Sequence, residues 1–521
     1  MEHQREPEHR QEHHHHHHHH RHHESYQHTH TFKRQLRDTG TVGPVYAASM
    51  AVCVGATASG TALSWTSNLT SDWRTGDLND IIIDKDQMKW ISQFQSLGGM
   101  VSCIPTGLLN DYIGRKPTLM VATIPFYIGW ASMVYGQHIT FLYIGRFFCG
   151  VGSGMFNVTC PLYVAEISPV AVRGRTTTSF FVFYGFGMLY ANFFGYVLPI
   201  KLFIFACAAI PFMFNSMFFF QPKSPVHNIQ MGKIQESQEV LRKLRGSRYD
   251  LWPEIRTIQL ELSRGYYRNH FWDMFKEKAV RKACYMGLSL VALKQLSGVT
   301  RSHFYTKEIV SGVEWIDKYW GACITGVAQL LFALIPVLVC DKVGRKFLLF
   351  VSFSTMALSA AALGVYYTLK EREVITKEQL ATISWAPVVA LALYLGGYSV
   401  GVASISYSYP VEILPADIRA RLNSGFVAFN YFNAFFCTTF YKVVQARFGN
   451  DTVFYICGLW ASLGALLSVF WYPETKNKTS YEVFAQMEGR DVSHDIKSKR
   501  KIVMHNVPAE EKGYEKETFP N

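Results

Sequence analysis

The sequence predicts an all-α membrane protein with twelve transmembrane helices in two six-helix halves and a helical cytoplasmic loop between the halves. Three observations lead to this prediction. Of the 521 residues, 49% are apolar and only 17% are charged, whereas a soluble protein carries about 25% charged residues. The apolar residues gather in stretches of about twenty residues, the length that a bilayer core requires. Charged motifs also recur at corresponding places in the two halves, which indicates a duplicated unit.

The apolar stretches define the expected spans and domains. They lie at 43–64, 90–109, 117–136, 139–161, 177–198, 201–221, 283–306, 318–340, 347–368, 384–408, 422–444 and 452–472. We therefore expect a tail at 1–40, a six-helix bundle at 41–221, a linker at 222–282, a second bundle at 283–472 and a tail at 473–521. Within the linker, apolar residues recur at helical spacing at 233–245, which predicts an amphipathic helix, and 252–262 is expected to form a second helix.

Both tails are polar. The first contains an unbroken run from His13 to His20, which is typical of a metal-binding tail, a disordered tail or an added purification tag. A flexible run has no shaped site and hence no metal selectivity, so we expect a disordered tail and no metal site. The tail after Pro473 is assigned no fold. The ten cysteines lie almost all within apolar stretches and lack metal or disulfide spacing, so we expect buried, unpaired thiols and no cofactor.

The basic residues predict the orientation. Thirteen Lys and Arg against seven Asp and Glu lie between Pro222 and Lys282, and the other basic groups fall between apolar stretches. This pattern places the linker and both termini in the cytoplasm and argues against nucleic-acid binding. The sequons at Asn68 and Asn450 then face outward and are predicted glycosylation sites. The sequons at Asn157, within a span, and at Asn477, on the inner side, should not be used.

Two charged motifs repeat between the halves. An Asp followed four residues later by an Arg comes after the second and the eighth stretch, with an offset of 230 residues. A Glu followed seven residues later by an Arg closes the fourth and the tenth stretch, with an offset of 246 residues. The Asp and Glu residues add nothing to the positive-inside pattern, so we expect a gate at the cytoplasmic rim in which an Asp pairs with an Arg of the neighbouring bundle. These gating candidates are Asp111, Arg115, Glu166, Arg173, Asp341, Arg345, Glu412 and Arg419. The alternative is that they only set topology.

Longer motifs carry a family resemblance. They are Gly107 to Lys116, the set Gly145, Arg146, Gly150, Gly154, Pro161, Tyr163 and Glu166, the run Gln295-Leu296-Ser297-Gly298, and the run Pro473-Glu474-Thr475-Lys476. With these motifs the chain resembles the sugar porter family of the major facilitator superfamily over residues 43–490, and within it the insect trehalose and hexose facilitators. The resemblance implies alternating access without covalent chemistry, so no enzyme and no catalytic residue. It also implies a gating role for Glu474.

The same resemblance points to a divergent substrate pocket. Three amides of the family pattern remain as Gln295, Gln329 and Asn430, and aromatic faces remain at Tyr407 and Tyr431. Phe181, Lys294 and Thr300 replace neutral amides of the pattern. Sugar recognition requires side chains that donate and accept hydrogen bonds around an aromatic face. Each amide could instead form only a helix–helix hydrogen bond.

Lys294 is the most unusual of these residues. A Lys in mid-membrane costs about 2.5–3.5 kcal/mol and tends to mark a transport pathway or a paired charge. No acid lies at similar depth in the neighbouring spans. Lys294 and Arg301 are seven residues apart, so an unbroken helix would place them on one face. The alternative is that Lys294 snorkels or bonds backbone carbonyls.

The sequence thus predicts a monomeric plasma-membrane uniporter of a sugar such as trehalose or a hexose, with the lipid bilayer as its other contact. The first span has no acid near Arg146, so no proton carrier is expected. Two other functions remain open: a carrier of the same fold for a small organic anion or other polar metabolite, and a membrane sensor or scaffold that does not transport. An enzyme finds no support, because the chain has no nucleophile elbow, zinc motif or P-loop.

Overall fold

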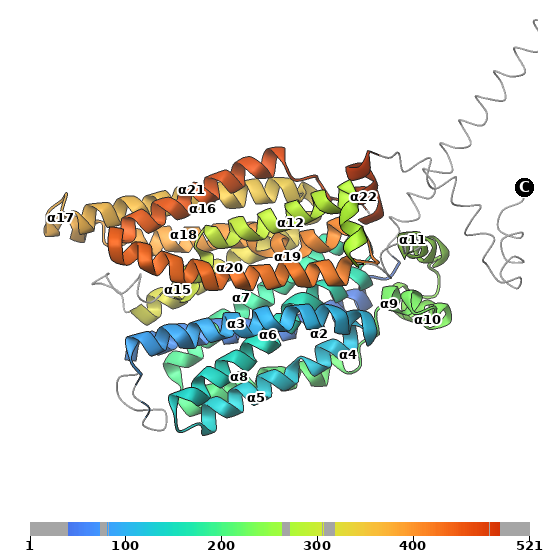
Figure 1. The fold of residues 1–521 in the computed structure, drawn as a ribbon, viewed down its shortest axis with the longest axis horizontal. Helices are drawn as coiled ribbons and strands as arrows, with labels where there is room; N and C mark the ends of the chain where they lie inside the picture. Colours follow the sequence, from blue (N-terminus) through green and yellow to red (C-terminus); the bar gives the residue numbers. More distant parts are fainter. Residues whose placement is uncertain are drawn as a thin grey trace, which may run out of the picture.

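The computed structural model describes residues 40–72, 81, 83–262, 271–304, 306, 318–478 and 480–489, and these residues form helices and connecting turns without a strand. The expectations for the His-rich tail and for the last residues of the chain lie outside this part. Two groups of long helices run side by side, one from each half of the sequence (Figure 1).

The first half supplies six spans, as expected. They are α2 (Gly43–Asp72), α3 (Lys85–Tyr112), α4 (Arg115–Val121) with α5 (Thr123–Tyr135), α6 (Ile139–Ile167), α7 (Arg173–Val197) and α8 (Ile200–Phe218). The third span is divided at Ala122, where α4 ends and α5 begins.

The second half supplies the other six. They are α12 (Lys278–Leu296) with α13 (Val299–Phe304), α15 (Lys318–Val343), α16 (Arg345–Glu371), α18 (Ala386–Val400) with α19 (Val402–Ile413), α20 (Arg419–Phe448) and α21 (Asn450–Phe470). The short α17 (Lys377–Thr382) connects α16 to α18.

Two expected spans of the second half are broken at glycines. Gly298 has φ +81°, a conformation that an L side chain adopts only with strain. At Gly401 a Cβ would lie 2.3 Å from the Leu348 carbonyl oxygen, so the glycine allows α16 to approach closely. The break at Gly298 corrects the expectation that Lys294 and Arg301 share one helix face. Lys294 lies over the ring of Tyr407, whereas Arg301 donates to Gln445.

The linker folds as short helices at one end of the bundle, called here the linker end (Figure 1). They are α9 (Pro225–Gln230), α10 (Ile234–Arg245), α11 (Trp252–Leu262) and the 3₁₀ helix η2 (Phe271–Lys276). The two helices expected from the sequence are therefore confirmed. Leu241 and Ile255 are fully buried in a small apolar core that includes Ala416 from the α19–α20 turn, so this core packs the linker against the second half.

The C-terminal tail corrects the sequence interpretation, because it contains the helix α22 (Ser480–Glu488) at the linker end. Val483, Phe484 and Ala485 of this helix are almost fully buried, and α22 lies against α12 and α19. A single apolar face within a polar tail is a weak sequence signal, since only a neighbouring surface makes it a helix face.

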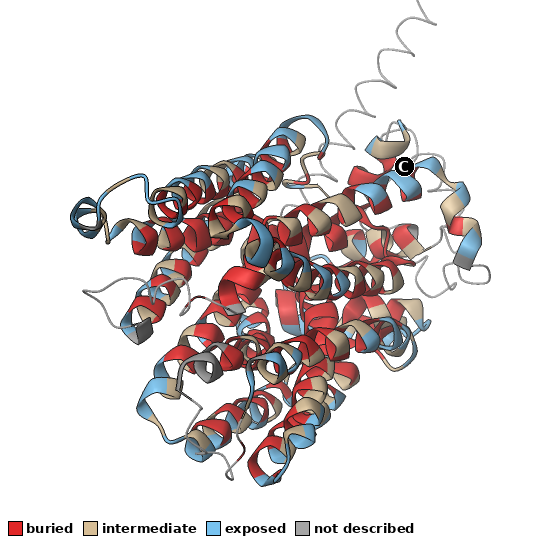
Figure 2. Ribbon diagram, turned by 60° about the vertical axis from the view of Figure 1, so that its left-hand side comes forward, coloured by how far each residue is buried: buried red, intermediate tan, exposed pale blue. Residues whose placement is uncertain are grey.

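Burial distinguishes the two kinds of surface in the bundle. Buried residues concentrate between the helices and exposed ones on the outward faces (Figure 2). The exposed residues include large apolar ones such as Leu459 and Phe212. By length and composition, nine described spans are apolar enough to cross a membrane. The other three expected spans, α3, α12 and α20, do not reach that threshold because they carry polar side chains. Gln95, Gln295 and Asn430 are examples, and each is buried between helices.

Candidate functional site

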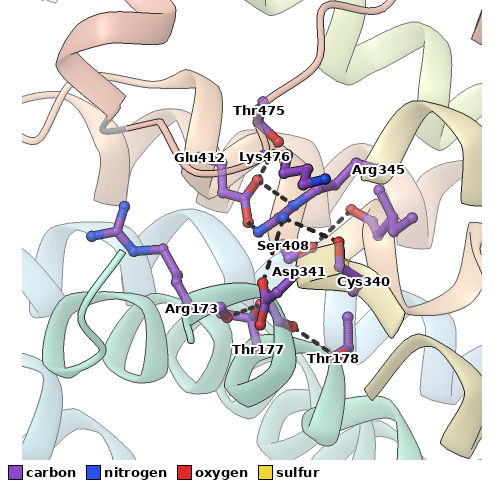
Figure 3. Close-up of polar contacts among 12 residues, drawn as sticks. Arg173, Thr177, Thr178, Cys340, Asp341, Arg345, Ser408, Glu412, Thr475 and Lys476 are labelled. Carbon is purple, nitrogen blue, oxygen red and sulfur yellow. Dashed lines mark hydrogen bonds and ion pairs between the residues drawn. The ribbon is translucent and has the colours of Figure 1, made fainter. Parts of the chain in front are cut away.

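A buried ion pair lies at the linker end of each half. In the first half, Arg115 Nη2 lies 2.7 Å from Glu166 Oε1, and both side chains are buried. In the second half, Arg345 Nη2 lies 2.9 Å from Glu412 Oε1 (Figure 3). Each Arg begins a helix directly after a glycine with positive φ. The repeated sequence motif therefore forms the same local structure twice.

In both ion pairs the Glu carboxylate also accepts a hydrogen bond from a hydroxyl group. Ser224 Oγ donates to Glu166, and Thr475 Oγ1 donates to Glu412. Tyr163 and Tyr409 donate to the carbonyl oxygens of Pro222 and Pro473 at 2.7 and 3.2 Å. The start of the linker and the start of the C-terminal tail thus attach to the two halves in the same way.

The two aspartates connect one half to the other. Asp111 Oδ2 lies 2.8 Å from Arg421 Nε, and Asp341 Oδ2 accepts the backbone N–H of Arg175 at 3.0 Å. Both partners are the second Arg of an Arg-x-Arg sequence that begins α7 or α20. The gating residues expected from the sequence are the first Arg of each, Arg173 and Arg419, and Arg175 and Arg421 are not among them. The repeated Arg-x-Arg spacing was the signal available in the sequence.

Arg419 and Arg173 lie elsewhere. Arg419 Nη2 lies 3.3 Å from Glu261 Oε2 of α11, so it bonds the linker rather than the first half. Within the described residues Arg173 has no ion pair, and its Nε is buried without a hydrogen-bond partner.

Glu474 holds the start of α16. Its carboxylate accepts the backbone N–H groups of Arg345 and Lys346 at 3.0 and 3.1 Å, where a negative charge is favoured by the helix dipole. The corresponding residue of the first half is Lys223, which is exposed and lies 3.7 Å from Glu236. The two halves therefore differ at this point.

His227 lies where the first half lacks such a carboxylate. A Cβ on Gly114 would lie 3.0 Å from the imidazole ring of His227, and Nε2 of the ring is buried without a hydrogen-bond partner. Burial, and then the Arg115 guanidinium, lower the pKa of His227 below its usual value of 6.5. The neutral imidazole therefore fits this site better than the charged one.

In the centre of the bundle, three of the expected substrate residues bond to one another. Gln295 Nε2 donates to Asn430 Oδ1 at 2.8 Å, and Thr300 Oγ1 donates to Gln295 Oε1 at 2.6 Å. Both ends of the Gln295 amide are thus used within the protein. Asn430 Nδ2 donates no hydrogen bond to the described residues.

Gln329 forms a separate hydrogen-bonded group with His303. Its Oε1 is 3.1 Å from His303 Nε2, while His303 Nδ1 is 3.0 Å from the Val299 carbonyl oxygen. Gln329 Nε2 is buried without a partner. In a neutral imidazole Nδ1 donates to the Val299 carbonyl oxygen, so Nε2 accepts. The Gln329 amide must then present its nitrogen to His303, and its nitrogen and oxygen positions are exchanged accordingly, since such assignments follow from the hydrogen-bond network. His303 was not among the residues expected from the sequence.

Aromatic side chains from the two halves contact one another in the centre of the bundle. Phe181 of α7 stacks on Tyr184 and meets Tyr398 of α18 edge-on, with ring centroids 5.7 and 5.5 Å apart. The Tyr431 hydroxyl of α20 accepts from Asn157 of α6 at 2.8 Å. Phe181 and Tyr431 therefore act as contacts between the halves.

Lys294 and Tyr407 line a small cavity in the second half. The Lys294 ammonium lies 4.0 Å from the centroid of the Tyr407 ring, and Lys294 is only 3% exposed. The cavity has a volume of about 10 Å³, and Asn423 and Asn430 also line it, so it has room for about one water molecule. No acidic residue of the described part forms an ion pair with Lys294.

Arg146 is buried without an acid partner among the described residues. It donates to the Ala62 carbonyl oxygen and to Thr66 Oγ1, both at 2.6 Å, and to the Gln95 side chain. Its guanidinium also lies 5.2 Å from the ring of Trp65. Neutral oxygens and an aromatic ring thus occupy the surroundings of this charge.

The two predicted glycosylation sites lie at helix ends. Asn68 is in the last turns of α2, which extends to Asp72, and its side chain is outside the described part. Asn450 begins α21, and its Nδ2 donates to Glu371 Oε1 at 2.6 Å. Glycosylation at either residue stays a prediction.

Known proteins resemble this chain over most of its length. Residues 18–486 match the family model "Sugar (and other) transporter". The facilitated trehalose transporter Tret1 of Bombyx mori is 30% identical over 447 residues, which are 84% of this chain and 85% of that protein. The Tret1 of Polypedilum vanderplanki is 27% identical over 492 residues, 90% of this chain and 95% of that protein.

A solved structure shows the same fold. The proton:xylose symporter XylE of the major facilitator superfamily, bound to 6-bromo-6-deoxy-D-glucose, superposes with a TM-score of 0.74 at 20% identity, covering 85% of this chain and 99% of that one. The twelve spans in two halves are thus those of the major facilitator fold. The chain is a membrane protein that belongs to the sugar (and other) transporter family, whose members carry solutes and are not enzymes.

Proposed function

We propose that this protein is a facilitative transporter that moves a sugar such as trehalose or a hexose across the plasma membrane by alternating access. The observation that carries the proposal is the placement of a polar centre between two halves that are joined mainly by separable contacts. Gln295, Thr300, Gln329 and Asn430 supply amide and hydroxyl groups in that centre. The Asp111–Arg421 ion pair and the Asp341 bond to Arg175 close the linker end.

Movement of the halves supplies the transport step. Opening at the linker end requires these two aspartate contacts to break, and opening at the other end requires the bond from Gln93 to Thr439, 2.6 Å long, to break. Each ion pair within a half can persist during such a rigid-body motion. With the linker and both termini in the cytoplasm, the aspartates form the inner gate of a monomeric carrier.

The transport runs down the concentration gradient, because within the described residues the buried Arg146 is surrounded by neutral oxygens and by no carboxylate. Without an acid beside it, this position offers no group to exchange a proton during the cycle.

Uptake of radiolabelled trehalose and glucose by cells that express the protein tests the proposal. We expect uptake that saturates, stops at the external concentration and is insensitive to a protonophore. Accumulation above the external concentration that collapses with the protonophore would contradict downhill transport. The absence of any sugar uptake by protein shown to be at the cell surface would favour the sensor or scaffold.

A further inference from the structure

The small cavity beside Lys294 contains an excess of hydrogen-bond donors. Lys294 Nζ, Asn430 Nδ2 and the Tyr407 hydroxyl belong to side chains that line it. None of these donors has an acceptor among the described residues, although all three residues are at most 9% exposed. Asn423 Oδ1 and the Ser406 hydroxyl oxygen are side-chain acceptors there, because Asn423 Nδ2 donates to the Val158 carbonyl oxygen and Ser406 Oγ donates to the Ala403 carbonyl oxygen, both at 3.1 Å.

This set of groups fits an anion better than a hydroxyl group. A sugar hydroxyl both donates and accepts, so a site built for it balances donors with acceptors. A carboxylate only accepts, and its two oxygens offer about four lone-pair positions. One ammonium, one amide N–H₂ and one phenol hydroxyl can satisfy these positions, and the full positive charge favours an ionised partner.

Among the described residues no carboxylate neutralises Lys294, and its one charge-stabilising contact there is the Tyr407 ring at 4.0 Å. A buried charge without a partner is destabilising, and charged residues inside membrane bundles tend to mark substrate pathways. Arg146 offers a comparison within the chain, since its guanidinium is satisfied by oxygen atoms.

We propose that Lys294, together with Asn430 and Tyr407, binds a carboxylate of the transported molecule, so that the substrate class is an acidic sugar such as a hexuronate. The inference rests on the proposed sugar transport and narrows its substrate. The carboxylate lies in the cavity beside Lys294, and the ring hydroxyls reach the end of the Gln329 amide that His303 does not contact. A volume of about 10 Å³ does not admit a sugar, so the substrate enters when the halves separate.

Uptake of D-glucuronate and D-glucose into proteoliposomes with the full-length protein tests this assignment, because the two sugars share a ring and differ at C6. We expect glucuronate to be preferred by about tenfold or more, as for a hydrogen-bonded charge. Lys294→Gln should abolish that preference and Lys294→Arg should retain part of it. Lys201→Gln, at an exposed position of α8, is the matched control and should leave the preference unchanged.

Two further measurements sharpen the result. An inside-positive membrane potential should accelerate glucuronate uptake and leave glucose uptake unchanged, since only the former moves a negative charge. Gln295→Ala should lower the uptake of both sugars, which separates a general site effect from charge recognition. Thermal unfolding of each variant shows that it is folded.

Competing outcomes are distinct. Preferred uptake of glucose 6-phosphate would overturn the carboxylate assignment in favour of phosphate, and uptake of lactate without any sugar would overturn the acidic sugar. Equal uptake of glucose and glucuronate that Lys294→Gln does not alter would overturn this inference and leave sugar transport intact. Folded protein that moves neither sugar would contradict the proposed function itself.

Discussion

At the scale of single residues, the centre of this protein combines satisfied and unsatisfied groups. Gln295 is held at both ends by Asn430 and Thr300, so it is positioned by the protein. Lys294, one residue earlier, has only an aromatic face as a partner within the described chain. Of these two neighbouring residues, one has its hydrogen bonds satisfied by the protein and the other does not. Polar groups left unsatisfied in this way are expected at functional sites.

The unpaired charge at Lys294 should cost stability. The effective desolvation penalty of a buried ion is several kcal/mol, and it exceeds the roughly 2 kcal/mol that a desolvated cation–π contact with Tyr407 returns. We therefore expect Lys294→Met to raise the free energy of unfolding by at least about 1 kcal/mol, seen as a higher melting temperature in detergent. Lys201→Met, at an exposed position, is the control. A lower melting temperature for Lys294→Met would show that the charge has a stabilising partner.

At the scale of elements, glycines decide where the spans bend. The α12–α13 break puts Gly298 at φ +81°, and a Cβ there would lie 2.4 Å from Cys457 Sγ. A second close contact involves the linker, because α9 places the His227 ring against Gly114, directly before α4. Both features depend on neighbours that are distant in the sequence.

Gly298→Ala should disturb the packing of α13 against α21. Strain from the positive φ costs about 1–2 kcal/mol, and the steric overlap with Cys457 adds to it. We expect lower sugar uptake and a lower melting temperature. Gly425→Ala in α20 is the matched control, because no atom lies within 4 Å of its Cβ position, and Ala is about 1 kcal/mol better than Gly inside a helix. Equal effects of the two variants would show that the bend at Gly298 is unimportant.

His227 should make the linker end sensitive to acid. Its pKa in the folded protein is lowered, mainly by burial, so the folded state binds fewer protons than the unfolded state near the usual pKa of about 6.5. Stability should therefore fall as the pH falls through that value. Melting temperatures at pH 7.5 and 5.5 should differ less for His227→Gln than for the unaltered protein. An identical pH dependence would rule out His227 as its source.

At the scale of the whole molecule, the two halves are alike in sequence and structure but are closed by unlike contacts. The Asp111 contact is an ion pair between side chains, whereas Asp341 accepts a backbone N–H. The linker also bonds each half, since Arg245 donates to the Ile167 carbonyl oxygen at 2.9 Å and Glu261 pairs with Arg419. The linker therefore helps to hold the two halves together at the linker end.

Breaking the Asp111–Arg421 pair should favour opening at the linker end. Asp111→Asn removes one charge and should shift the equilibrium between conformations by about tenfold, which corresponds to 1.4 kcal/mol. Cys103 reports the change, because it is fully buried in a cluster with Tyr431 between α3 and α20. In a variant with Cys103 as its single cysteine, maleimide labelling should accelerate.

The charge exchange Asp111→Arg with Arg421→Asp provides the control, since it restores an ion pair of opposite polarity. Labelling should then slow toward the original rate. Labelling that Asp111→Asn leaves unchanged would show that this pair does not hold the linker end closed.

The architecture and the family could be predicted from the amino-acid sequence. Spans of twenty apolar residues, basic loops and repeated motifs are local or periodic signals, so the spanning helices and the linker helices at 234–245 and 252–262 followed from them. The ion pairs Arg115–Glu166 and Arg345–Glu412, which lie within one half each, were not expected from the sequence. The amide, hydroxyl and aromatic composition of the centre was also predictable as a set of residues.

Which residues contact one another depends on how the helices pack and could not be predicted. Arg175 and Arg421 rather than Arg173 and Arg419 join the halves, because helix rotation selects one of two Arg on the same turn. The break at Gly298 separates Lys294 from Arg301, and the burial of α22 depends on α12 and α19. The donor excess around Lys294 likewise arises from three separate helices, α12, α19 and α20, since hydrogen-bond balance is a property of the packed site and not of any one segment.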